Sequence, residues 1–173
     1  MRSCRGVTLI ELMVTITIVA ILATVAVPSF VDFIRQNRVS ATANEFVALV
    51  ALARSEAIRR GNTVTVCKSA DKVTCTTSGN WGQAVIVFVD GNTRGVIDGA
   101  DTIVRVVSPP ASGISVSASD TNVSNWLTYL SSGVSVGNGN SRNGGSFAVC
   151  GAPYARTITI DATGRVSSVK TSC

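Results

Sequence analysis

One acidic residue lies inside an otherwise uncharged, mostly apolar stretch near the start of this 173-residue chain. Glu11 is the only ionisable side chain between Val7 and Val31. A carboxylate among apolar groups costs roughly 3 kcal/mol and usually has a cationic partner, because charges attract more strongly where water is excluded. The position of Glu11 therefore predicts a charge-pairing site.

Cleavage after Gly6 would create a partner for that carboxylate. Val7 would then carry a positively charged α-amine, and Glu11 would be the fifth residue of the mature chain, about one helical turn away. The two groups of one subunit would interact weakly. Between subunits, the carboxylate of one copy would neutralise the amine of its neighbour as their helices slide into register. Glu11 is therefore expected to set the register of an assembly.

Cysteines form the second set of residues with possible chemistry. Cys4 would be lost with the first six residues, and four cysteines would remain. An even count in an exported chain indicates two disulfides, with three possible pairings. We favour Cys67–Cys75, which would tie a short hairpin, and Cys150–Cys173, which would hold the C-terminus on a strand. Zinc is disfavoured, because the chain has no histidine and no C-x-x-C spacing.

The segment DGNTRGVIDGAD, residues 90–101, resembles a calcium loop in its spacing. Asp90, Asn92, Gly95 and Asp101 occupy positions 1, 3, 6 and 12 of an EF-hand loop. However, Arg94 stands at position 5, no glutamate closes the loop, and no helices are predicted beside it. A polar connection between two strands is the favoured interpretation, and no metal is expected.

Basic residues accumulate at the end of the chain. After loss of Arg2 and Arg5, 13 of the 15 basic side chains remain against 10 acidic ones, a formal charge of +3. Residues 7–140 contain nine of each sign, so the excess lies in the last stretch. Such a patch could bind the phosphates of double-stranded DNA, or it could be a solvated cationic loop. Its cations are Arg142, Arg156, Arg165 and Lys170.

Enzyme activity has little support in the sequence. A nucleophilic serine, threonine or cysteine needs a base, and histidine, the commonest base, is absent from the chain. The carboxylates show no recognisable catalytic pairing. The glycine-rich segment GNGNSRNGG, residues 137–145, is followed by no predicted helix, so a phosphate loop is also rejected and a flexible loop is expected. We predict a structural and binding protein without a cofactor.

A membrane-spanning helix must position Glu11. The run from Val7 to Val31 exceeds the roughly 20 apolar residues that cross a bilayer. The arginines before it predict a cytoplasmic N-terminus and an exported remainder. A cleavable signal peptide ending at Ala26 is the alternative, but its apolar core would be unusually long and would contain an acid.

The helix is expected to continue to Arg60. An apolar stripe runs along it, and Gly61 provides a suitable C-terminal stop. Pro28 removes one backbone hydrogen bond, which predicts a kink or local loosening. The stripe consists of Val39, Ala43, Phe46, Val50, Ala53 and Ala57.

Short β-type runs bounded by turn residues fill the remainder. They predict antiparallel sheets in one domain. The runs are Thr63–Lys68, Gln83–Val89, Ile103–Val107, Ile114–Val116, Trp126–Leu130, Ser146–Cys150 and Arg156–Ile160.

The N-terminal segment RGVTLIELMVTITIVAILATVAVP resembles the leader of type IV pilins and type II secretion pseudopilins. The shared features are a basic leader, Gly6 at the cut, Glu11 at mature position five and Pro28 at mature position 22. The resemblance implies that a prepilin peptidase cleaves after Gly6 and that the amine of Val7 is methylated. Valine replaces the more usual phenylalanine or methionine at the new terminus.

A second segment, NEFVALVALARSEAIRRGNTVTVC, is similar to the GspH/FimT/FimU group of minor pilins and pseudopilins. This resemblance implies an α+β, type IV pilin-like fold, in which a long N-terminal helix packs on a small antiparallel β head. The expected divisions are a leader (1–6), a transmembrane and assembly half-helix (7–31), an amphipathic half-helix (32–61) and a head (62–173).

The family resemblance also implies a function. The chain would be a minor pilin or pseudopilin in the bacterial inner membrane, with a periplasmic head, that helps initiate or cap a type IV pilus or a type II secretion pseudopilus. Its partners would be prepilin peptidase, membrane lipid, and other minor and major pilins or pseudopilins. The other class of protein to consider is a freestanding periplasmic enzyme or binding protein with an unusual signal sequence.

DNA uptake is the alternative within the family. In the FimT branch a C-terminal G-R-x-R motif contacts DNA. Gly164 and Arg165 match it here, but Ser167 stands where the second arginine belongs, and Lys170 compensates only in part.

Overall fold

Residues 6–99, 101–140, 142 and 144–173 are described in a computed structural model. The chain divides into two compact units, residues 1–35 and Gln36–Cys173. The predicted leader lies outside the described residues except for Gly6.

The helix α1 (Leu9–Arg60) spans 52 residues and confirms the predicted helix, apart from its first two positions. It ends where predicted, because Gly61 takes a φ of 66°, a left-handed conformation that glycine adopts without a Cβ clash. Near this end the side chains of Arg59 and Arg60 donate to Glu56. These hydrogen bonds lower the pKa of Glu56 to about 2.

Two antiparallel sheets follow the helix. The five-stranded sheet has the order β3-β2-β1-β5-β6, and the four-stranded sheet has the order β4-β7-β8-β9. The strands of the first sheet are β1 (Val64–Ser69), β2 (Ala84–Val89), β3 (Thr102–Val107), β5 (Trp126–Tyr129) and β6 (Ser135–Val136). Those of the second are β4 (Ser115–Ala118), β7 (Gly145–Gly151), β8 (Tyr154–Ile160) and β9 (Val166–Ser172).

All seven predicted β-type runs correspond to strands, although β4 begins at Ser115 rather than at Ile114. Two strands of the described chain, β6 and β9, were not predicted from the sequence. Strand β6 has only two residues. Strand β9 has its two valines, Val166 and Val169, three residues apart, so they do not repeat with the period of two that marks a half-buried strand. Its pairing with β8 stabilises it instead.

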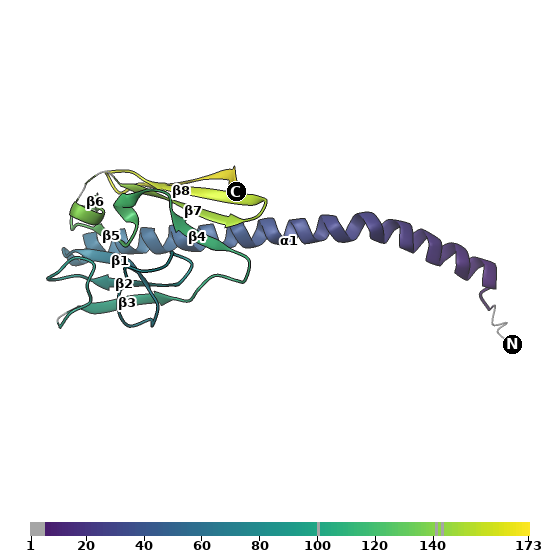
Figure 1. Cartoon of the computed structure of the whole chain (residues 1–173), viewed down its shortest axis with the longest axis horizontal. Helices are drawn as coiled ribbons and strands as arrows, with labels where there is room; N and C mark the ends of the chain where they lie inside the picture. Colours follow the sequence, from purple (N-terminus) through teal and green to yellow (C-terminus); the bar gives the residue numbers. More distant parts are fainter. Residues whose placement is uncertain (1–5, 100, 141, 143) are drawn as a thin grey trace. The chain divides into compact units, whose positions relative to one another are not determined.

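The main core surrounds the second half of α1, which runs between the two sheets (Figure 1). All six residues of the predicted apolar stripe are buried there. Phe46 packs against the rings of Trp81 and Phe147 at centroid distances of 5.9 and 4.7 Å. The amphipathic half of the helix is therefore part of the core of the second unit.

A smaller core covers the other face of the five-stranded sheet. Cys67, Ile86 and Phe88 are fully buried there, with Ile97 and Trp126 packed against them. Cys67 is bonded to Cys75, which fixes the loop after β1 over this face. The second disulfide, Cys150–Cys173, joins β7 to the C-terminus, so both bonds have the favoured pairing.

Candidate functional site

An exposed apolar surface covers the first part of α1. Among the described residues this is the one helix long and apolar enough to cross a bilayer. Leu9, Ile16 and Ile21 each expose at least 60% of their surface. Burying such side chains is worth roughly 1.5–3 kcal/mol each, so contact with apolar surroundings would stabilise this surface.

Threonines within the apolar stretch satisfy their own hydroxyl groups. Thr15, Thr17 and Thr24 donate to the carbonyl oxygens of Leu12, Met13 and Ile21 at 2.7–2.9 Å. A hydroxyl bonded within its own helix needs no outside partner in lipid. These threonines are therefore compatible with a membrane-spanning segment.

Glu11 lies in a capping motif at the start of α1. The backbone N–H of Glu11 donates to Thr8 Oγ1 at 3.3 Å, and that of Leu12 donates to the Thr8 carbonyl at 3.1 Å. This is the first half of a capping box, with the sequence T-x-x-E immediately before an apolar run. Thr8 is the residue that the sequence reasoning missed, although its spacing to Glu11 is a readable signal.

The carboxylate of Glu11 is exposed and makes no ion pair with any described residue. It also lies in the first turn of the helix, where the positive end of the helix dipole favours a negative charge. Gly6 and Val7 are exposed beside it in the sequence and precede the first helical residue. The acid therefore has local support, but it lacks a counter-ion in the described chain.

Pro28 lies inside α1, which continues without interruption in this chain. It offers no N–H to the carbonyl of Thr24. The predicted loosening stays a prediction for an assembly, where neighbouring helices would surround this turn.

The four C-terminal cations lie at two separate places, which corrects the expectation of one basic loop. Arg156 lies on β8 and Lys170 on β9, directly opposite each other. Arg165 lies in the turn between these strands, five residues from Lys170, or about 16 Å along an extended strand. The segment ATGRVSSVK is thus a turn followed by an unpredicted strand.

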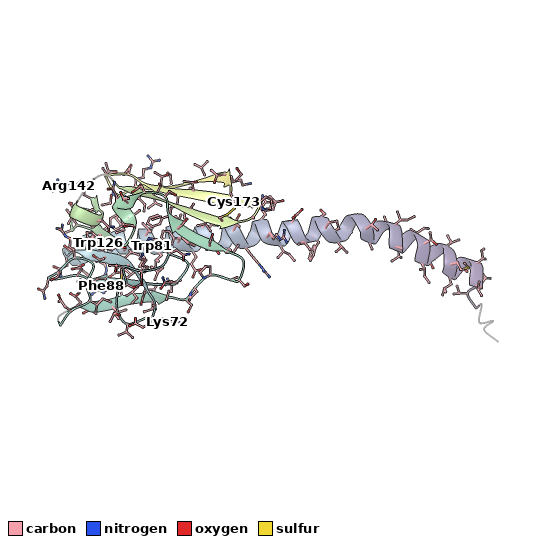
Figure 2. The ribbon with its side chains drawn as sticks, viewed as in Figure 1. Lys72, Trp81, Phe88, Trp126, Arg142 and Cys173 are labelled. Atoms are coloured by element: carbon pink, nitrogen blue, oxygen red, sulfur yellow. A yellow bond between two sulfur atoms is a disulfide. The ribbon has the colours of Figure 1, made fainter. Side chains whose placement is uncertain are left out.

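Arg142 lies at the same end of the four-stranded sheet as Arg165. Gly144, two residues further on, packs against Ile160 and Asp161 at the end of β8. Figure 2 shows Arg142 and Cys173 at different ends of the four-stranded sheet. Both Arg142 and Arg165 are exposed.

Asp161 opposes the charge of Arg165 in the same turn. Hydrogen bonds from the Thr163 hydroxyl and the Arg165 backbone amide lower the pKa of Asp161, so this acid stays ionised at neutral pH. The fold requires glycine at position 164, because Gly164 takes a φ of 83° and a Cβ there would collide with the Gly133 carbonyl. The two matching residues of the G-R-x-R motif therefore occupy a turn that the fold itself requires.

The segment from Asp90 to Asp101 is organised by hydrogen bonds within the protein. Asp90 accepts hydrogen bonds from the Thr65 hydroxyl at 2.7 Å and the Gly95 amide at 2.9 Å, and Asp101 accepts from the Gly91 amide at 2.9 Å. No cluster of metal-binding side chains occurs among the described residues. These hydrogen bonds lie in the connection between β2 and β3.

Both the apolar N-terminal segment and the head are similar to known proteins. Residues 42–164 match the family model described as type II transport protein GspH. Residues 1–27 match the prokaryotic N-terminal methylation motif. A fimbrial protein of Pseudomonas aeruginosa is 29% identical over 111 residues, which is 62% of this chain and 69% of the relative.

Solved structures of similar fold include the type IV minor pilin FimU of Pseudomonas aeruginosa. Its two crystal forms give TM-scores of 0.54 and 0.57 at 18% identity, covering 75% and 78% of this chain and 91% and 90% of FimU. The minor pseudopilin EpsH from the type 2 secretion system of Vibrio cholerae gives 0.52 at 14% identity, over 77% of this chain and 97% of EpsH. The α+β, type IV pilin-like fold is therefore confirmed.

Proposed function

The chain belongs to the GspH family of type II transport proteins, and we propose that it acts as a minor pilin or pseudopilin that helps initiate or cap a filament. The filament is a type IV pilus or a type II secretion pseudopilus. The role is structural, without catalysis. The observation that carries this proposal is the exposed apolar half of α1, which bears one acid without a counter-ion in the described residues.

Lipid would cover that half-helix before assembly, and the helices of other subunits would cover it after assembly. In the membrane, lipid surrounds it and holds the protein at the inner membrane, with the head in the periplasm. In the filament, the half-helices of other minor and major pilins or pseudopilins replace the lipid. The carboxylate of Glu11 then meets the amine of Val7 from an adjoining subunit, in surroundings where the attraction is strong.

Processing by prepilin peptidase supplies that amine. The match of residues 1–27 to the methylation motif supports cleavage after Gly6 and methylation of Val7. Gly6 also has no packing role among the described residues, because a Cβ at this position would meet none of their atoms within 4 Å. Its small size is therefore better explained by the active site of the peptidase than by the fold of this chain.

Mass spectrometry of the N-terminus tests this proposal. The full chain is expressed with and without a prepilin peptidase, and the expected product begins at N-methylated Val7 only when the enzyme is present. Replacing Gly6 by leucine should block cleavage. The matched control is Gly99→Leu, at another open glycine position. A purified chain that begins after residue 26, or that retains residues 1–6 in the presence of the enzyme, would refute the proposal.

Binding of double-stranded DNA is the second candidate. The observation that favours it is the exposed pair Arg142 and Arg165, which share one end of the four-stranded sheet. Asp161 weakens this surface for phosphate, and Ser167 leaves the family motif incomplete. DNA would therefore be a weak ligand of this end, additional to the filament role.

A further inference from the structure

Two like charges face the helix side of the four-stranded sheet. Arg156 and Lys170 are direct cross-strand neighbours on β8 and β9. Side chains alternate along a strand, so Arg156 points to the same face as Ile158 and Ile160, which are buried in the main core. The pair therefore lies on the inner face of the sheet, toward the second half of α1.

Neither cation is neutralised within the described part of the chain. The ion pairs found there involve only Glu56. The Nε of Arg156 is buried and has no hydrogen-bond partner. Like charges directly opposite each other destabilise a sheet, and a buried donor without a partner destabilises the fold further. The fold thus keeps an arrangement that weakens it unless an anion binds there.

A small cavity lies beside these two cations. It measures about 60 Å³ and lies between the start of the second unit on α1 and the β8–β9 pair. Gln36 and Ser40 of α1 and Tyr154 of β8 contribute polar side chains to its wall, and none of the described residues that line it is acidic. Two cations, an amide and two hydroxyls around one cavity are the donors that suit a phosphate group.

Protection of the sheet edge explains only part of this arrangement. Strand β9 is at the edge of its sheet, and an inward-pointing lysine on an edge strand hinders pairing with other chains. That reason applies to Lys170. Arg156 lies on β8, which is paired on both sides, so edge protection does not account for its unpartnered Nε.

The position of the cavity along the chain indicates the source of the phosphate. Gln36 is five residues from Val31, the last residue of the apolar run, so at most about 18 Å of chain separates them. Arg35 and Arg38 lie in the same short segment. We propose that the Arg156–Lys170 cavity binds the phosphate group of an anionic phospholipid at the surface of the membrane that α1 enters. This inference rests on the proposed membrane-anchored function.

Lipid retention tests the inference. The mature full chain is placed in nanodiscs of equal parts phosphatidylglycerol and zwitterionic phosphatidylcholine, and native mass spectrometry counts the lipids that stay bound. We expect the wild-type chain to retain phosphatidylglycerol over phosphatidylcholine roughly thirty-fold, on the scale of two basic residues near a charged surface. The variant Arg156→Gln/Lys170→Gln should reduce this ratio to about one.

The matched control is Arg142→Gln/Arg165→Gln, which removes the same charge from the other end of the same sheet. It should leave the ratio unchanged, and far-ultraviolet circular dichroism verifies the fold of both variants. An equal loss in the control, or no preference in the wild type, would overturn the lipid site. A third arm adds inorganic phosphate in excess, and complete displacement of the lipid would assign the cavity to a free anion and reject the proposal.

Failure of the lipid site and failure of the proposed function give different results. If the processed chain is recovered in the soluble fraction, both the proposed function and the lipid site fail. If the chain is embedded in the membrane and the Arg156→Gln/Lys170→Gln variant loses only binding to a partner pilin, the cavity binds a carboxylate of that partner and the lipid site alone is rejected.

Discussion

The two halves of α1 differ in burial. The second half carries a stripe that the chain's own two sheets cover, with Ala43, Val50 and Ala53 fully buried. The first half is exposed almost throughout, although it is more apolar. The difference shows that one helix can be self-sufficient over part of its length and depend on other molecules over the rest.

An acid in an apolar setting occurs in each region, and the two acids are supported differently. Asp90 is 4% exposed, and the Thr65 hydroxyl and the Gly95 amide donate to it within the head. Glu11 has only the backbone cap at Thr8 and no counter-ion in the described residues. Asp90 therefore receives hydrogen bonds within the head, whereas the carboxylate of Glu11 has no cationic partner among the described residues.

The largest expected effect is that of Glu11→Val. The protein should stay in the membrane, but its incorporation into sheared filaments should fall roughly a hundred-fold or more, because leaving one member of a buried ion pair unpaired costs about 3–5 kcal/mol. Quantitative blotting of filament and membrane fractions measures both quantities.

Glu11→Gln separates the ion pair from the capping box. Glutamine can complete a capping box but carries no charge. We therefore expect Glu11→Gln to reduce incorporation into filaments as strongly as Glu11→Val does. Thr8→Val removes the cap and keeps the acid, so it should reduce incorporation much less. Normal incorporation of the glutamine variant would show that the cap, and not charge pairing, is the role of this residue.

A matched pair of phenylalanine substitutions compares the two halves directly. Phe46→Ala removes a ring that is 6% exposed and contacts Trp81 and Phe147, so it should lower the free energy of unfolding by about 3–5 kcal/mol. Phe30→Ala removes a ring that is 63% exposed and should leave this free energy unchanged. Urea unfolding of the full chain in detergent, followed by tryptophan fluorescence, provides the measurement. Equal losses would contradict the division of α1.

Asp90→Asn should have a smaller, stabilising effect. Burial raises the pKa of Asp90 above its ordinary value of 3.8, so the folded state favours the protonated acid. The contribution of Asp90 to the free energy of unfolding is therefore fully present below pH 3.8, where the acid is protonated in both states. It is lost as the pH rises through the pKa of Asp90 in the folded state. Asparagine keeps the acceptor oxygen without the charge, and the gain should be roughly 1 kcal/mol at pH 7.

Thermal unfolding at a series of pH values checks the sign of this effect. The difference between Asp90→Asn and the wild type should shrink as the pH falls toward 3.8. A difference that grows at low pH would mean that the carboxylate form is the one the head stabilises.

Binding of DNA is the smallest expected effect. The candidate DNA surface is the Arg142–Arg165 end of the four-stranded sheet, which carries two of the four C-terminal cations. The logarithm of the binding constant should then fall with the logarithm of salt concentration with a slope of about −2, rather than the value near −4 expected for four contacts. Gel-shift titration of the full chain in detergent measures this slope, with Arg142→Ala/Arg165→Ala as the variant expected to lose binding. No shift at low salt would remove the DNA candidate.

Much of the fold follows from local pattern. The apolar run, the stripe from Val39 to Ala57 and Gly61 define the helix, because their periodicity and stop signal are local. The pairing of four cysteines was also anticipated from the short separation of Cys67 from Cys75 and from the place of Cys173 at the chain end. These features need no knowledge of distant contacts.

Other features could not be read from the sequence. Strand β9 depends on pairing with β8 and lacks apolar alternation of its own. The cross-strand position of Arg156 and Lys170 is likewise a matter of register, which a one-residue slip would change. The sequence therefore shows how many cations the C-terminal stretch has, but the strand register of the sheet determines that they lie in two separate pairs.

The burial of the second half of α1 between two sheets also has a mechanical consequence. In the proposed filament, tension would reach the head along this helix. The load then acts in shear on many packed side chains simultaneously, from Val39 to Ala57, rather than peeling them away one at a time. Because the Cys150–Cys173 bond also closes the C-terminal end of the chain onto β7, the head should yield late under tension.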